Sequence, residues 1–148
     1  MTTVLIIAHA PLASALKAVA QHAYPDCAAD VQALDVPRDA TESQVEAEAR
    51  VLIARRPGGA LVFTDVFGAT PCRGATLLLS DPGVRVVTGV NVPMLWRTLC
   101  YGTKEPLDAL VARATAGATQ GVMPVTASPP QNQAQWATPH DQAGRHDQ

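Results

Sequence analysis

Short apolar runs alternate with amphipathic stretches along most of this chain. The apolar runs are rich in β-branched residues and are short, which predicts buried strands. In each following stretch, apolar side chains recur every three or four residues, which predicts a helix. The expected strands cover residues 4–8, 31–36, 60–64 and 84–88, and the expected helices cover 11–23, 41–53, 71–79, 93–101 and 106–118. Four β-then-α units imply one open, mainly parallel α/β sheet with right-handed crossovers and helices on both faces.

Local signals mark where these helices begin. Thr41 and Gln44 have the spacing of a capping box. Pro11, Pro71 and Pro93 each stand where a helix would start, a position that tolerates proline because its missing N–H has no partner there.

The composition changes near residue 126. Residues 126–148 contain several prolines and glutamines and almost no aliphatic side chains. Such a segment cannot bury enough apolar surface to offset its ordering entropy. We therefore expect one domain over residues 1–125 and a disordered polar tail over 126–148.

Composition and charge exclude several classes of protein. The 148 residues suffice for one domain, and the formal net charge of −2 offers no basic surface for nucleic acid. No apolar stretch is long enough to span a bilayer, and the first residues lack a basic signal-peptide region, so we expect a cytoplasmic protein. Cys27, Cys72 and Cys100 are odd in number and lack paired spacing, which favours reduced thiols.

Candidate chemistry lies at the strand ends. His9 directly follows the first apolar run, and Asp65 follows the third. In open α/β sheets, ligands bind outside the carboxyl ends of the strands. With the flavodoxin-like strand order 2-1-3-4, the two side chains would face each other, and the carboxylate would fix the imidazole tautomer. A purely structural hydrogen bond between them is the alternative.

The sequence lacks the motifs of other common sites in α/β proteins. His9-Ala10-Pro11 stands where a dinucleotide site needs its glycines, and the chain contains no P-loop motif. The first strand is not followed by the acidic residues of a receiver domain, and His9 has no partner at zinc-ligand spacing. Helices that begin at Pro71 and Pro93 would instead direct backbone N–H groups into the crevice. Those groups suit a phosphoryl group without a metal or other cofactor.

Three segments resemble the mannose-type (mannose/fructose/sorbose) IIA component of the bacterial phosphoenolpyruvate-dependent sugar phosphotransferase system. They are residues 4–9, 63–71 and 89–95, and the sequence Gly-Val-Asn-Val-Pro-Met-Leu in the last is the most specific. The resemblance covers roughly residues 3–125. It departs at Phe67 and Ala69, where the family often has tryptophan and glycine.

The resemblance implies a role for each site residue. His9 would carry the phosphoryl group on Nε2, Asp65 would orient the ring, and Thr70 would hold the phosphoryl oxygens. The backbone at Gly68 and Ala69 would assist Thr70. Contacts with partner proteins would involve Phe67, Asn91, Pro93 and Met94.

The resemblance also implies partners. The phosphocarrier protein HPr would donate the phosphoryl group and a IIB component would accept it for sugar uptake, with the chain at most peripheral to a membrane permease. The family further implies a homodimer, in which a short strand at about residues 121–125 pairs at the edge of the partner's sheet. Two alternatives stay open: a regulatory phosphoprotein whose His9 state another protein reads, and a small-molecule binding domain that uses the same crevice.

Overall fold

The structure, a computed structural model, describes residues 1–102 and 104–127. Four parallel strands form one sheet in the order β2-β1-β3-β4, with β1 at Thr3–His9, β2 at Gln32–Val36, β3 at Ala60–Thr64 and β4 at Val84–Val87. The α/β class and the strand order predicted from the sequence are confirmed. β1 lies between β2 and β3, and His9 at its end pairs with Val36 of β2, whereas β3 ends at Thr64 beside Ile7.

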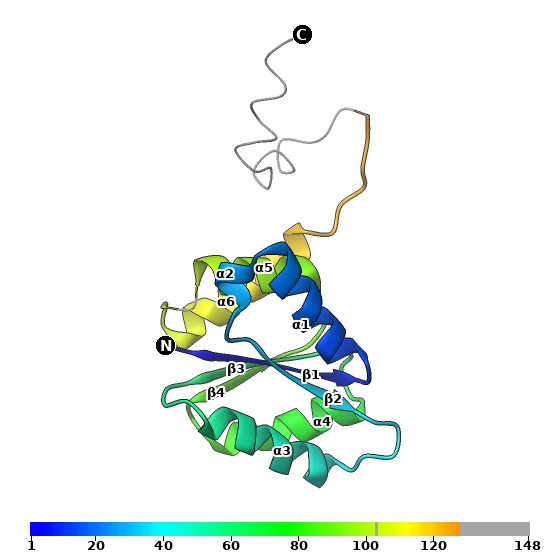
Figure 1. The fold of residues 1–148 in the computed structure, drawn as a ribbon, viewed down its shortest axis with the longest axis vertical. Coiled ribbons are helices and arrows are strands. Elements are labelled where there is room, and N and C mark those ends of the chain that lie inside the picture. The colour runs from blue at the N-terminus through cyan, green and yellow to red at the C-terminus, as the bar shows by residue number, and fades with distance from the viewer. Residues whose placement is uncertain (103, 128–148) are drawn as a thin grey trace.

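Helices cover both faces of the sheet (Figure 1). One layer contains α1 (Leu12–Ala23), α2 (Pro25–Ala28), α5 (Val92–Tyr101) and α6 (Leu107–Gln120). The other contains α3 (Glu42–Ala54) and α4 (Thr70–Thr76), which continues into the 3₁₀ turn η1 (Leu77–Ser80). Thr41 and Gln44 form the expected capping box at the start of α3.

Each face of the sheet has its own apolar core. Ile6 and Phe63 point toward the layer of α1, α5 and α6, whereas Ile7 and Val62 point toward α3 and α4. Successive side chains of a strand point to opposite faces. The central strands β1 and β3 are covered on both sides and are therefore apolar at nearly every position, which explains their continuous apolar runs in the sequence.

Some local expectations differ from the structure. Pro11 is the N-cap residue of α1 rather than its first helical residue, because its φ of −100° and ψ of 24° are not helical. The short helix α2 follows at Pro25, where the sequence indicated only a break. Residues 122–126 form neither a helix nor a strand in the single chain, so the expected strand there would depend on a partner. Of the tail expected over residues 126–148, residues 128–148 lie outside the described residues.

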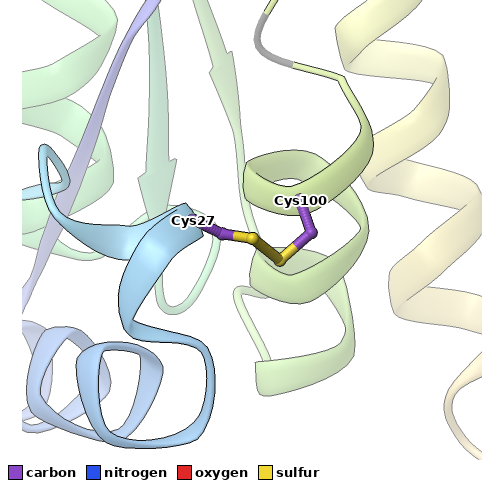
Figure 2. Close-up of a disulfide and its surroundings, with 2 residues drawn as sticks. All are labelled: Cys27 and Cys100. Atoms are coloured by element: carbon purple, nitrogen blue, oxygen red, sulfur yellow. A yellow bond between two sulfur atoms is a disulfide. The ribbon is translucent and has the colours of Figure 1, made fainter. Parts of the chain in front are cut away.

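The cysteines correct one sequence-based expectation. Cys27 in α2 and Cys100 in α5 form a disulfide, with their Cα atoms 5.0 Å apart (Figure 2). Cys72 in α4 is buried and unpaired. The expectation of three reduced thiols is wrong for this structure because α2, which the sequence did not indicate, places Cys27 against α5.

In the described parts of the chain, no helix combines the length and apolarity that crossing a membrane requires.

Candidate functional site

His9 and Asp65 lie in direct contact at the carboxyl end of the sheet. Nδ1 of His9 is 2.6 Å from Oδ2 of Asp65, and the same oxygen accepts the His9 backbone N–H at 3.0 Å. The His9 side chain is 49% exposed, whereas Asp65 is 13% exposed. With Nδ1 donating to the carboxylate, Nε2 carries the free lone pair and makes no hydrogen bond within the described residues.

The Asp65 carboxylate is held in its ionised form. Burial raises its pKa, but the hydrogen bonds from the His9 backbone and ring and from the Val66 N–H lower it further than burial raises it. The net result is a pKa below the ordinary aspartate value of 3.8. An ionised carboxylate is a hydrogen-bond acceptor only, so it pairs with an Nδ1–H on the ring.

The loop between Asp65 and α4 continues the site. Gly68 has a φ of +86°, a backbone conformation that side-chain-bearing residues rarely adopt. The loop leads through Ala69 to Thr70, the first residue of α4, and α4 contacts β1. The Thr70 hydroxyl makes no hydrogen bond to any residue that the structure describes, so it is available to a ligand at this edge.

A second loop lies beside the first. The N–H groups of Gly89 and Val90 donate to the carbonyl oxygens of Asp65 and Thr64, at 2.9 and 3.0 Å. The connection from β4 to α5 therefore borders the His9 site. The strand order brings three loops together here: β1 to α1, β3 to α4 and β4 to α5.

Asn91, Pro93 and Met94 stabilise the connection between β4 and α5 and the start of α5. Asn91 Oδ1 accepts the Met94 N–H at 2.9 Å, and Asn91 Nδ2 donates to the Ala118 carbonyl at 3.2 Å. Pro93 packs so closely on Gly121 that a Cβ on this glycine would collide with it. Met94 is 1% exposed and belongs to the core, so it offers no surface to a partner. These contacts correct the expectation that Met94 contacts a partner, and they give Asn91 and Pro93 structural roles.

Phe67, unlike the buried Met94, is exposed to solvent. Its side chain is 84% exposed, two residues after Asp65, and its neighbour Val66 is also exposed. Large apolar side chains that are this accessible beside a reactive group are typical of a protein-binding surface.

The sequence did not single out Asp35, which lies near the end of β2. Its carboxylate accepts hydrogen bonds from the backbone N–H and hydroxyl of Ser14 in α1. The sequence feature that could have drawn attention to Asp35 is its charge within a predicted strand, between the apolar Leu34 and Val36.

Comparison with known proteins identifies the fold and the family. A family model described as the PTS system fructose IIA component (EIIA-man) matches residues 3–115, which include all of the elements around His9. The chain belongs to this family. The mannose-type IIA family indicated by the sequence segments is therefore confirmed.

One curated relative of this IIA chain illustrates the match. The mannose-specific EIIAB component of the phosphotransferase system from Escherichia coli K12 is 36% identical over 73 residues. Those residues are 48% of this chain and 23% of the relative, so the match spans less than a quarter of that longer protein.

Two solved structures share the fold over nearly their whole length. The mannose/sorbose-specific IIA subunit from Enterococcus faecalis has a TM-score of 0.76 and 23% identity, covering 88% of this chain and 98% of that one. Component EIIA from Streptococcus agalactiae has a TM-score of 0.75 and 19% identity, covering 84% and 97%.

Proposed function

We propose that this IIA chain carries a phosphoryl group on Nε2 of His9, accepting it from phosphorylated HPr and passing it to a IIB component during sugar uptake. The observation that carries the proposal is the 2.6 Å contact between His9 Nδ1 and Asp65 Oδ2. It fixes the tautomer in which Nε2 is the nucleophile, and the ring is half exposed to an incoming protein.

The transfer needs positioning and charge stabilisation more than covalent chemistry. Nε2 attacks the phosphorus in line, so that the Nε2–P bond forms while the N–P bond of the donor histidine breaks. The donor ring, protonated on its other nitrogen, takes the electron pair of the broken N–P bond and leaves as a neutral imidazole, and the proton on His9 Nδ1 stays in the hydrogen bond to Asp65. The ionised Asp65 stabilises the positive charge that develops on the His9 ring.

The phosphoryl oxygens are proposed to bind at the start of α4. The free Thr70 hydroxyl and the backbone at Gly68 and Ala69 lie on the loop that follows Asp65. Hydrogen-bond donors placed where charge develops stabilise a transferring phosphoryl group without a metal.

The exposed Phe67 is proposed to contact HPr and IIB. It is exposed and lies two residues after Asp65, the hydrogen-bond partner of His9, so we expect a protein that presents its own histidine to Nε2 to cover it. Transfer in both directions would then use one docking surface.

The chain is also proposed to be a homodimer. Residues 122–126 continue beyond α6 without regular structure, and Val122 and Val125 are exposed. Pairing of this segment with the sheet edge of a second copy would bury both valines. Sedimentation at micromolar concentration should show a dimer, and a monomer there would contradict the assembly while leaving the site intact.

Phosphorylation of the purified chain tests the function. Incubation with enzyme I, HPr and phosphoenolpyruvate should add one acid-labile, base-stable phosphoryl group per chain, detected by intact mass. His9→Ala should abolish the addition with the fold retained, because His9 is an exposed strand-end side chain outside both cores. His22→Ala is the matched control, since His22 is an exposed histidine at the other end of α1. Labelling that persists in His9→Ala would overturn the proposal.

A further inference from the structure

The start of α1 has no capping side chain of its own. Its N-cap residue is Pro11, which has no side-chain acceptor for the exposed N–H groups of the first turn. Asp35 in β2 supplies the acceptor instead. Its Oδ1 accepts the Ser14 backbone N–H at 2.9 Å, and its Oδ2 accepts the Ser14 hydroxyl at 2.5 Å. A residue of the neighbouring strand thus caps the helix that follows His9.

With this cap, the segment from His9 to Ser14 is hydrogen-bonded on both sides. On the β3 side, Asp65 accepts the His9 backbone N–H at 3.0 Å. On the β2 side, the Val36 carbonyl accepts the Ala10 N–H at 2.9 Å, and Asp35 then holds Ser14. The loop between β1 and α1 is therefore attached to both strands that flank β1, with a carboxylate on each side.

We infer that Asp35 is a positioning residue for the phosphoryl transfer proposed above, acting through Ser14 to keep the His9 ring aligned. The inference rests on the proposed function for its kinetic consequence, but the ring geometry is measurable without phosphorylation. The hydrogen bonds of the Asp35 carboxylate go to Ser14 and not to His9 or Asp65. It fixes where α1 begins, and so limits the positions that Ala10 and His9 can take.

A loss of this hold should affect the chemical step more than docking. If α1 shifts, His9 can leave the Asp65 carboxylate, and both ring tautomers become populated. Misplacing a reacting group by about 1 Å costs up to about a hundredfold in rate. The exposed Phe67 is on a different loop, so the docking surface stays in place.

The experiment compares Asp35→Ala, Asp35→Asn and Ser14→Ala. Asparagine can keep the arrangement, because its Oδ1 accepts the Ser14 N–H while its Nδ2 donates to the Ser14 hydroxyl. That hydroxyl can then donate to the Pro11 carbonyl, 3.2 Å away. Asp35→Asn should therefore restore what Asp35→Ala loses. Ser14→Ala keeps the backbone hydrogen bond and should have an intermediate effect.

Asp108→Ala is the matched control. Asp108 also links the first turn of a helix to a strand, through an ion pair of 2.9 Å between its Oδ1 and Arg85 Nε. That helix begins beside Gly59, at the opposite end of the sheet from His9.

Two measurements decide the inference. Nitrogen-15 NMR of the His9 ring should show the Nδ1–H tautomer in the wild type and in Asp108→Ala, and a mixture of tautomers in Asp35→Ala. With phosphorylated HPr as substrate, kcat should fall by about tenfold to a hundredfold in Asp35→Ala while KM changes less than about twofold.

An unchanged tautomer and unchanged kcat in Asp35→Ala would overturn the inference, as would an equal loss of kcat in Asp108→Ala. If Asp35→Ala does not fold, Ser14→Ala is decisive, and wild-type NMR and kcat in that variant would overturn the inference. If the wild type accepts no phosphoryl group, the proposed function fails, and the His9 NMR signals still show whether Asp35 positions the ring.

Discussion

The disulfide between Cys27 and Cys100 should make the stability of this protein depend strongly on redox conditions. It joins α2 to α5 across a sequence separation of 73 residues, so reduction releases a long loop in the unfolded chain. The perturbation is reduction of the wild type, or replacement of either cysteine by serine. Cys27→Ser and Cys100→Ser should behave alike, because each removes the same cross-link.

The expected magnitude follows from the loop length. In the chain-entropy model, a cross-link over the 73-residue separation lowers the entropy of the unfolded state by about 15 cal/mol/K, about 4 kcal/mol at 25 °C. For a domain of this size, Tm changes by about 3–4 °C per kcal/mol, so reduction should lower Tm by about 12–16 °C. The free energy of unfolding of a typical domain is about 5–15 kcal/mol, so the reduced protein should stay folded at 25 °C.

Thiol titration and thermal unfolding together provide the assay. Under denaturing conditions without reductant, the oxidised protein should show one titratable thiol, that of Cys72. After reduction, all three cysteines should titrate. Circular dichroism melts with and without reductant should differ in the wild type and coincide in Cys27→Ser. Cys72→Ala is the control, since it removes the unpaired buried cysteine and should keep the redox dependence.

Two results would refute this reasoning. Three titratable thiols in air-oxidised, unfolded protein would show that the cross-link does not form. A single reactive thiol with a Tm difference below about 2 °C would show that the cross-link forms but that loop entropy does not govern its contribution.

The remaining predictions concern the site. Asp65→Asn should lower the free energy of unfolding by about 1–3 kcal/mol at pH 7, because the amide loses charge-assisted hydrogen bonds. The Asp65 pKa is lower in the folded state than its ordinary value of 3.8. Its stabilisation is therefore full above about pH 4 and is lost as the pH falls through the folded pKa, so the difference between urea titrations of variant and wild type should shrink steadily as the pH is lowered below 3.8. Equal destabilisation at pH 7 and pH 2 would argue against an ionised Asp65. Thr70→Ala should slow single-turnover phosphoryl transfer by the equivalent of about 1.5–3 kcal/mol, one hydrogen bond to a charged group, and an unchanged rate would remove Thr70 from the site. Phe67→Ala should raise KM for phosphorylated HPr by about fivefold to thirtyfold, the loss of one exposed contact worth about 1–2 kcal/mol. A fall in kcat at constant KM would instead place Phe67 in the chemical step.

The sequence by itself determined those features that depend on neighbouring residues. Short runs rich in apolar and β-branched residues located all four strands, because strands in a sheet that is covered on both faces bury most of their side chains. The Thr41–Gln44 capping box marked the start of α3, since its hydrogen bonds join residues three positions apart. His9 and Asp65 were predictable because the carboxyl ends of adjacent parallel strands lie at one edge of a sheet.

Only the tertiary structure decided the contacts between distant segments. Met94 belongs to the family-like segment 89–95, whose resemblance implied a partner contact, yet in α5 it is buried in the core between α5, α6 and the sheet. The pairing of Cys27 with Cys100 required α2, a helix too short to have a periodic signal. The hydrogen bonds from Ser14 to Asp35 depend on where α1 packs on β2. Each of these contacts joins residues that local patterns cannot relate, because their separation in space is set by the packing of the whole domain.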